Sequence, residues 1–239
     1  MACQRRTAHK FIAALALVAA AQLSAGCTRL SQKQRCVFID GGAHFGESYT
    51  DFTKTNLYSQ YSWDIFAIEA NPNLAARLPR APRLTVINKA IWVSDGTMEF
   101  HMQTDTSGSN SLLKKFDGEN SKNITVETFD FNEWVKRSFS RDDYIILSLD
   151  IEGAEFEVLE KMSKDGTFRY LDRLYVSWHP SLLESQGKSM KEGEAWAFQL
   201  MQRARRKVFI IGDDSADKMM RRGDWVDFLL ADPQKKQRL

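Results

Sequence analysis

The stretch "VFIDGGAHFGES", Val37 to Ser48, decides the fold. A short apolar run ending at Ile39 predicts a buried strand, and the glycines directly after it allow a sharp turn and a close approach of a ligand to the backbone. Glu47 and Ser48 suit the first turn of a helix, where acidic and small polar side chains satisfy free amides. The stretch therefore predicts a strand, a glycine-rich turn and a helix, a unit that presents backbone N–H groups to a bound cofactor.

Two kinds of cofactor use such a turn. Gly41, Ala43 and Gly46 form G-x-A-x-x-G, a degenerate match to the pattern that holds a dinucleotide pyrophosphate. Asp40 lies just before the first of these glycines, where its negative charge would stand beside a pyrophosphate. A cationic ligand that carries an amino group suits this acid better.

A second strand candidate, Ile65 to Ile68, ends at Glu69. Glu69 follows Asp40 by 29 residues (69 minus 40), the length of one helix plus one strand, so both acids are expected at the same edge of a parallel sheet. An acid in this place can accept both hydroxyls of a ribose. Asn71 and Pro72 then form a good helix start.

The rest of the chain alternates strand and helix patterns. Further strands are expected within residues 83–92, 96–101, 124–129, 145–149, 173–178, 207–214 and 225–232, and the strand at 96–101 is expected as a hairpin arm turned at 94–96. Helices are expected around 132–137, 155–162 and 193–206, and a polar loop at 104–111. This order predicts a mostly parallel sheet with helices on both faces, and the last two strands predict an antiparallel pair at one edge. Functional side chains should gather at the carboxyl ends of the parallel strands, which places Asp150 and His179 beside Asp40 and Glu69.

The composition is that of a globular α/β domain: 239 residues, 43% hydrophobic and 27% charged, with a formal net charge of +2. Residues 1–39 hold six basic and no acidic side chains, so the remainder has 27 basic against 31 acidic side chains, a net charge of −4. Nucleic-acid binding requires a basic face, so we expect no nucleic-acid partner.

The amino-terminal segment has a basic start, the apolar run "FIAALALVAAA" at Phe11 to Ala21, and a small-residue exit. This predicts a secretory signal peptide or short signal-anchor over residues 1–26, with possible membrane attachment and a secretory-lumen location. The alternatives are an organelle transit peptide and a lipoprotein site at Cys27. Cys3, Cys27 and Cys36 lack metal-ligand spacing.

The stretch "LSLDIEGAEFEVLEKM", Leu147 to Met162, resembles the D-[IV]-E-G-x-E-x-x-V-L signature of the FkbM family, which belongs to the class I S-adenosylmethionine-dependent methyltransferases. "IDGGAHFGE" is similar to the cofactor loop of that family, "IEANP" to its ribose-binding strand end and "VETFDFNEW" to its V-x-T-L-D segment. The resemblance runs from Cys36 to about Ala231. It implies a Rossmann-like fold with a mostly parallel seven-stranded sheet and an antiparallel edge strand.

The expected organisation is then a signal or anchor over 1–26, a linker over 27–34, a methyltransferase domain over 35–231 and a basic tail over 232–239. The implied reaction transfers a methyl group from S-adenosylmethionine to a hydroxyl of a sugar, glycan or other hydroxylated small molecule. The oligomeric state is left open.

The resemblance also assigns roles to residues. His179 is the first choice for the base that takes the hydroxyl proton, and Asp150 the second. The residues expected at the cofactor are Asp40, Gly41, Gly42, Ala43, Gly46, Glu69, Ala70, Asn88, Ala90 and Asp150, and those expected at the substrate are Glu152 and Trp178. No metal is expected, because Asp150 and Glu152 lack a convincing third ligand.

Two positions depart from the family pattern. Ser148 stands where the family usually has a basic residue, and Ser177 where it usually has a Glu. These departures motivate an alternative, a non-catalytic module that binds S-adenosylmethionine without turnover. A less favoured alternative is an NAD-type oxidoreductase, against which Asp40 and the D-I-E-G stretch argue.

Overall fold

The computed structural model describes residues 35–104, 110–113, 121–204 and 208–211. The signal, linker and tail predictions lie outside these residues and stay predictions. Within the described part of the chain, no helix has the length and apolar character needed to cross a membrane.

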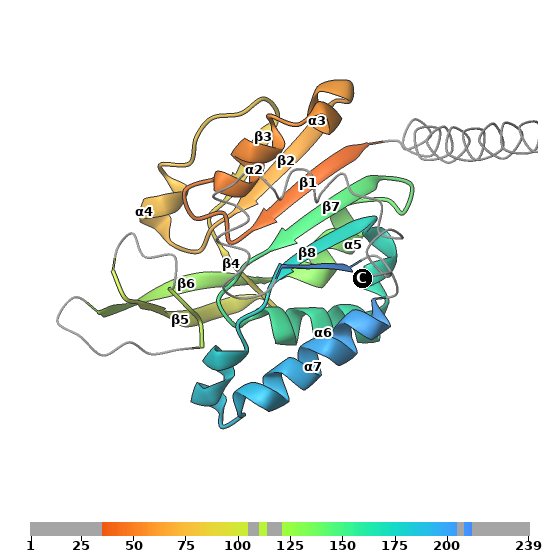
Figure 1. Ribbon diagram of the computed structural model, residues 1–239. Helices are drawn as coiled ribbons and strands as arrows, with labels where there is room; N and C mark the ends of the chain where they lie inside the picture. The colour runs from red at the N-terminus through yellow and green to blue at the C-terminus, as the bar shows by residue number, and fades with distance from the viewer. Residues whose placement is uncertain (1–34, 105–109, 114–120, 205–207, 212–239) are drawn as a thin grey trace, which may run out of the picture. The chain divides into compact units, whose positions relative to one another are not determined.

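Six parallel strands form the main sheet, in the order β3-β2-β1-β7-β8-β9 (Figure 1). Their bounds are β1 (Cys36–Gly41), β2 (Trp63–Ile68), β3 (Leu84–Ile87), β7 (Tyr144–Leu149), β8 (Arg173–Ser177) and β9 (Val208–Ile211). From β1 the chain builds outward to β2 and β3 on one side, and later from β7 to β8 and β9 on the other. The carboxyl ends of the neighbouring strands β1 and β7 therefore form the switch point of the sheet, where ligands bind in open α/β folds.

The helices lie on both faces of this sheet, as the sequence predicted. They are α2 (Glu47–Phe52), α3 (Asn56–Gln60), α4 (Pro72–Ala75), α5 (Phe131–Ser138), α6 (Glu155–Asp165) and α7 (Met190–Arg203), with the 3-10 helices η1 (Thr167–Tyr170) and η2 (Pro180–Gln186). Alternate residues of β1 point to opposite faces. Val37 and Ile39 join the core that α5, α6 and α7 cover, while the ring of Phe38 stacks on Phe52 of α2 at 4.3 Å.

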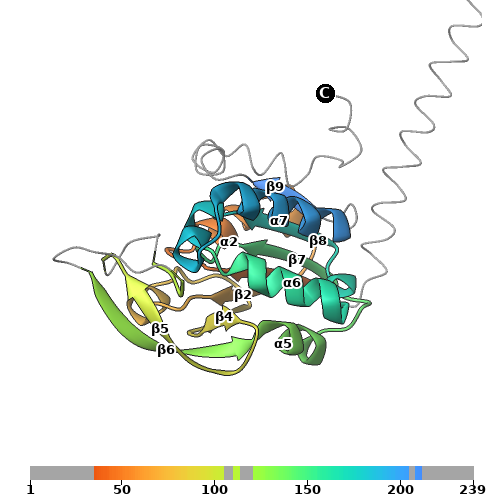
Figure 2. The ribbon, with the colours of Figure 1, turned by 90° about the horizontal axis from the view of Figure 1, so that it is seen from below.

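Helices α6 and α7 lie side by side across one face (Figure 2). The indole Nε1 of Trp196 in α7 donates to Glu160 Oε2 in α6 at 3.0 Å, and Arg203 forms an ion pair with the same carboxylate. These bonds fix α6, and with it the loop that leads into α6 from the end of β7.

A separate sheet of three strands, β4-β6-β5, adjoins the main one (Figure 1). It comprises β4 (Ala90–Trp92), β5 (Gly96–Met102) and β6 (Lys122–Asp130), with β5 antiparallel to β6 and β4 parallel to it. Its small core contains Ala90, Phe100, Met102, Leu112 and Val126.

Three expectations on the sheet are not met. The single strand expected at 83–92 is two strands in two sheets, because the Asn88 side chain bonds the carbonyls of Glu69 and Ala70 and turns the chain away after β3. The segment 96–101 does not form a hairpin with the strand before it, since β6 lies between β4 and β5. The seventh strand and the antiparallel edge are not confirmed, and residues 225–232 lie outside the described residues.

Candidate functional site

The glycine-rich turn after β1 is tied to the end of β2. The amides of Gly42 and Ala43 both donate to the carbonyl of Ile68, at 2.9 and 3.0 Å. Gly42 has φ +84°, and a Cβ there would lie 1.7 Å from the carbonyl oxygen of Asp150. Only glycine combines this conformation with such a close approach, so the turn brings the ends of β1, β2 and β7 together.

Gly41 and Gly46 complete the turn. The carbonyl of Gly41 accepts the amide of Asp150 at 2.8 Å, which extends the pairing of β1 with β7 past the strand ends. Gly46, with φ +83°, is the residue before α2, and a Cβ on it would meet the ring of Tyr49 at 2.6 Å. These two glycines and Ala43 shape the turn, but they do not line the pocket described below.

Glu69 is the first residue after β2 and is 7% exposed. Its Oε2 accepts the amide of His44 at 2.8 Å and its Oε1 accepts the amide of Asn71 at 2.8 Å. The two amides lower the pKa of the Glu69 carboxyl, but burial has the larger effect and raises it above its ordinary value. Each oxygen keeps a second lone pair, so the carboxylate can still accept two ligand hydroxyls.

Asp40 lies at the end of β1 and is 1% exposed. Its Oδ2 accepts the amide of Tyr49 in α2 at 3.2 Å. Burial disfavours the charged form and raises the pKa of Asp40 to about 7, with the carboxylates of Asp150, Glu47 and Glu69 adding to the effect. Asp40 does not line the pocket, so its contact with a cofactor stays a prediction.

Ala70, Asn88 and Ala90 were expected around the cofactor. Ala70 and Ala90 line the pocket, whereas Asn88 lies behind it and holds the carbonyls of Glu69 and Ala70 with its Nδ2, at 2.8 and 3.2 Å. The part that Asn88 plays in this structure is to hold the chain that carries Glu69.

Asp150 and Glu152 follow β7 and line the pocket. The Asp150 side chain is 36% exposed and that of Glu152 is 17% exposed. Glu152 has φ +51°, a left-handed conformation that is uncommon outside glycine and marks a tight loop. Gly153 follows with φ +99° and donates its amide to Glu155 Oε2 at 2.8 Å.

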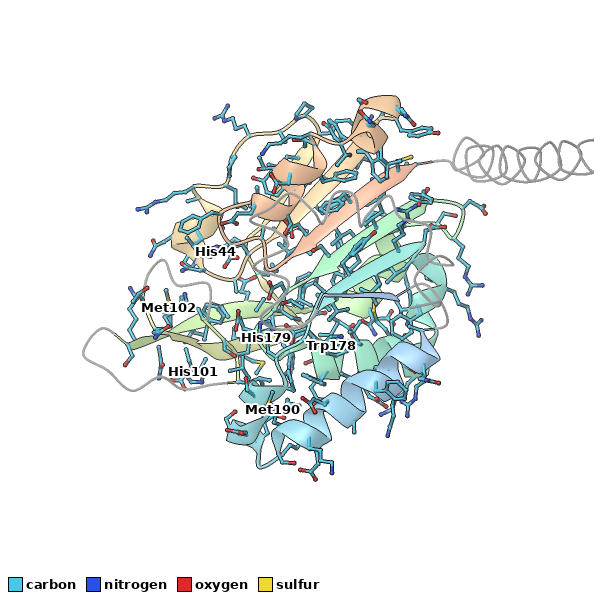
Figure 3. The ribbon with its side chains drawn as sticks, viewed as in Figure 1. His44, His101, Met102, Trp178, His179 and Met190 are labelled. Atoms are coloured by element: carbon cyan, nitrogen blue, oxygen red, sulfur yellow. The ribbon has the colours of Figure 1, made fainter. Side chains whose placement is uncertain are left out.

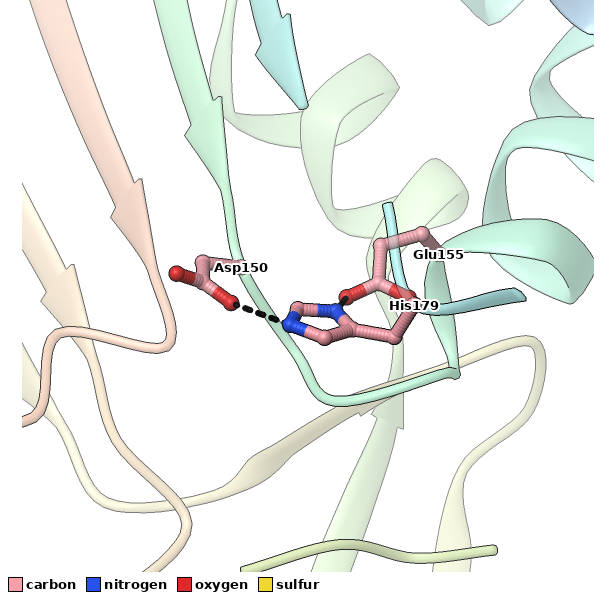
Figure 4. Close-up of side chains that lie close together, drawn as sticks. All are labelled: Asp150, Glu155 and His179. Carbon is pink, nitrogen blue, oxygen red and sulfur yellow. Dashed lines mark hydrogen bonds and ion pairs between the residues drawn. The ribbon is translucent and has the colours of Figure 1, made fainter. Parts of the chain in front are cut away.

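His179 follows β8 by two residues (Figure 3). Three carboxylates surround its ring, and Figure 4 shows two of them, those of Asp150 and Glu155. Its Nδ1 lies 3.1 Å from Glu155 Oε1, and its Nε2 lies 3.7 Å from Asp150 Oδ1 and 3.5 Å from Glu152 Oε1. Burial alone lowers the pKa of His179, but the charges of Glu155, Asp150 and Glu152 outweigh it and raise the pKa to about 10. Among these carboxylates the imidazole is therefore charged at neutral pH.

Glu155 is a site residue to which the sequence analysis gave no role. Its side chain is fully buried at the start of α6, where Oε1 accepts the amide of Ile151 and Oε2 that of Gly153, each at 2.8 Å. It thus closes the loop after Asp150 and also anchors His179. The signal was its place in the D-I-E-G-x-E stretch, but only the fold shows that His179 lies against it.

Trp178, Ser148 and Ser177 do not line the pocket. Trp178 is 5% exposed and packs its ring on Phe156 of α6 at 5.0 Å. It lies in the main core, so its expected contact with a substrate stays a prediction. Ser177 is buried as the last residue of β8, and Ser148 lies within β7.

One pocket, open to solvent, brings several members of this site together at the carboxyl edge of the sheet. It is walled by loops of the main sheet and by residues of the small sheet and its neighbouring loop. Its lining includes Gly42, His44, Glu69, Ala70, Leu74, Lys89, Ala90, Ile91, Phe100, Asn110, Leu112, Asp150 and Glu152. Of the residues expected at the site, Gly42, Glu69, Ala70, Ala90, Asp150 and Glu152 line it directly.

Comparison with known protein families identifies the family of the chain, whereas two other comparisons found no match. No curated protein and no solved structure matches the chain. Residues 40–201 match the methyltransferase FkbM domain, a span from the acid at the end of β1 to the last turns of α7. The chain is therefore a member of the FkbM methyltransferase family.

Proposed function

We propose that this methyltransferase binds S-adenosylmethionine in the pocket at the switch point and methylates a hydroxyl of a sugar, glycan or other hydroxylated small molecule. The observation that carries the proposal is the meeting of Gly42, Glu69 and Asp150 on the wall of one pocket. These residues come from the ends of three neighbouring strands, β1, β2 and β7.

The residues present fit this cofactor. Gly42 lines the pocket without a side chain, so a ligand can approach the backbone of the turn there. Glu69 would accept the ribose hydroxyls with its remaining lone pairs, and Ala70, Leu74 and Ala90 give a small apolar wall for the adenine. When bound, S-adenosylmethionine supplies a methyl group on a positively charged sulfur, and the acids of the pocket suit a cationic ligand.

The acceptor side is formed by Asp150 and Glu152. A hydroxyl must lose its proton as it attacks the methyl group, and a nearby base takes that proton. His179 was the first choice for the base, yet its pKa of about 10 leaves its imidazole protonated at neutral pH. Asp150, which lines the pocket with a third of its side chain exposed, is the better candidate, and His179 holds it in place.

The first test is calorimetric titration of S-adenosylmethionine and of its demethylated product into the full chain. We expect binding in the micromolar range, weakened at least tenfold in Glu69→Gln because the amide cannot accept both ribose hydroxyls. Glu99→Gln is the matched control, since Glu99 lies on β5 outside the pocket and is 54% exposed. Equal affinity of the wild type and Glu69→Gln would reject this placement of the ribose.

The second test offers a panel of hydroxylated acceptors with labelled cofactor. Transfer of label to a hydroxyl that is lost in Asp150→Asn supports the proposed reaction. Cofactor binding with no transfer to any acceptor would instead favour the non-catalytic binding module. Binding of NAD in place of S-adenosylmethionine would favour an oxidoreductase.

A further inference from the structure

Both ring nitrogens of His179 face carboxylates, but in different ways. On one edge of the ring, Nδ1 lies 3.1 Å from Glu155, which is fully buried and also accepts two backbone amides. On the other edge, Nε2 lies 3.7 Å from Asp150 (Figure 4) and 3.5 Å from Glu152, and both of these residues line the pocket. One edge of the imidazole is thus held by a fully buried carboxylate, and the other faces the carboxylates of two residues that line the pocket.

The hydrogen bond at Nδ1 determines whether Nε2 carries a proton in the neutral ring. Glu155 has only acceptor atoms, so the hydrogen bond requires Nδ1 to carry a proton. In the neutral ring Nε2 then presents a lone pair on the side of two carboxylates, which together form a set of acceptors that can ligate a cation. Histidines that ligate metals usually donate their other N–H to a carboxylate in this way.

The distances from Nε2 to the two carboxylates suit an ion that all three ligands share. Charge-assisted N–H···O bonds are about 2.7–2.9 Å long, shorter than the 3.7 and 3.5 Å from Nε2 to Asp150 and Glu152. Two ligands about 2.1 Å from one ion lie about 3.0 Å apart at an octahedral angle and about 3.4 Å apart at a tetrahedral one. The two observed separations are close to this range.

We propose that Asp150, Glu152 and Nε2 of His179 bind a divalent cation at the wall of the pocket, with Glu155 as the outer partner that orients the histidine. Asp150, Glu155 and His179 already bring their ligand atoms within 4.8 Å of one another. Because Glu155 and Asp150 lie at opposite edges of the ring, we assign Glu155 to the outer position and Glu152 to the ion (Figure 4).

The sequence alone favoured no metal here, because it offered two carboxylates and no third ligand. The third ligand comes from the end of β8, 27 residues after Glu152 (179 minus 152), and only the pairing of β7 with β8 brings it close. One imidazole with carboxylates suits ions such as Mn²⁺ and Zn²⁺. If the proposed function holds, a hydroxyl bound to this ion would release its proton more readily, which deepens that function.

The test uses Mn²⁺ added to the chelator-treated full chain at pH 8, with the loss of the free-ion signal in electron paramagnetic resonance as the readout. We expect one Mn²⁺ per chain, bound at least tenfold more weakly in Asp150→Asn, in Glu152→Gln and in His179→Gln. The matched control is Asp142→Asn, the same change just before the opposite end of β7, where the residue is exposed. Circular dichroism verifies the fold of each variant.

Absence of a stoichiometric Mn²⁺ site in folded wild-type protein would overturn the proposal. Equal binding by the wild type and the three ligand variants would overturn it as well. S-adenosylmethionine affinity is measured on the same samples without Mn²⁺. Loss of the ion site with intact cofactor binding rejects only this inference, while an ion site without cofactor binding rejects only the proposed function.

Discussion

Two sides of the pocket are built in different ways. The glycine side, formed by the loops after β1 and β2, is held by backbone amides that donate to Ile68 and to Glu69. The histidine side, formed by the loop after β7, is held by the charges of His179, which follows β8, and of its three neighbouring carboxylates. The first side therefore depends on backbone shape, and the second on protonation.

The largest effect should come from adding one methyl group on the glycine side. Gly42→Ala places a Cβ 1.7 Å from the Asp150 carbonyl at φ +84°, so the ends of β1 and β7 must move apart. We expect a loss of about 3 kcal/mol or more in the free energy of unfolding, measured by urea denaturation. Gly187→Ala is the control: it has a similar φ of +76° but open space around it, so only the backbone term of about 1 kcal/mol remains. Equal losses in the two variants would show that the close approach does not matter.

On the histidine side, Glu155→Gln should also have a large effect. The amide leaves the charged imidazole without its buried partner and turns an N–H₂ group toward a backbone amide. We expect a loss of about 3 kcal/mol in the free energy of unfolding. Glu157→Gln, on the half-buried side of the same helix, should change it by less than about 0.5 kcal/mol.

In the same Glu155→Gln protein, the pKa of His179 should fall from about 10 toward its ordinary value, measured by NMR titration of the ring protons. A stable variant in which the pKa of His179 stays near 10 would mean that Asp150 and Glu152 alone charge the ring.

The two sides should also lose stability in different pH windows. The native state keeps the proton of Asp40 up to about pH 7, whereas the unfolded chain releases it near 3.8, so stability falls as the pH rises between these values. The raised pKa of His179 gives stability that is complete below about 6.5 and is lost as the pH rises through about 10.

Asp40→Asn should flatten the lower window and His179→Gln the upper one, each by up to about 4 kcal/mol, as one pKa unit equals about 1.4 kcal/mol. The measurement is denaturation of chelator-treated protein from pH 4 to 10. If either variant keeps the pH profile of the wild type, its residue does not titrate as the structure indicates.

The smallest effect is expected from Trp178→Phe. Its indole N–H is buried with no hydrogen-bond partner among the described residues, so phenylalanine removes an unsatisfied donor while keeping the contact with Phe156. We expect a change below about 1 kcal/mol in the free energy of unfolding and unchanged methyl transfer. Trp63→Phe is the matched control and should cost more, because the Trp63 indole donates to the carbonyl of Leu57. A stable Trp178→Phe protein with lost transfer would support the predicted substrate contact.

The sequence determined much of the fold because its signals are local. The apolar run before Asp40, the glycines after it and the acid at Glu69 predicted β1, its turn and the end of β2, and the D-I-E-G stretch predicted β7 and α6. Local patterns failed at residues 83–92, where the apolar run continues across two strands. The break there is made by Asn88, whose partners are 18 and 19 residues away along the chain.

Only the tertiary structure determined which side chains of the site contact one another. The sequence identified Asp150 and His179 as candidates, but their protonation depends on which side chains surround them and on how far water is excluded. Glu155 lies 24 residues from His179 along the chain, and only the parallel pairing of β7 with β8 places it against the ring. Spacing along a chain predicts which residues share an edge of a sheet; the distances that fix a charge, or bring together the ligands of an ion, arise only when the strands pack.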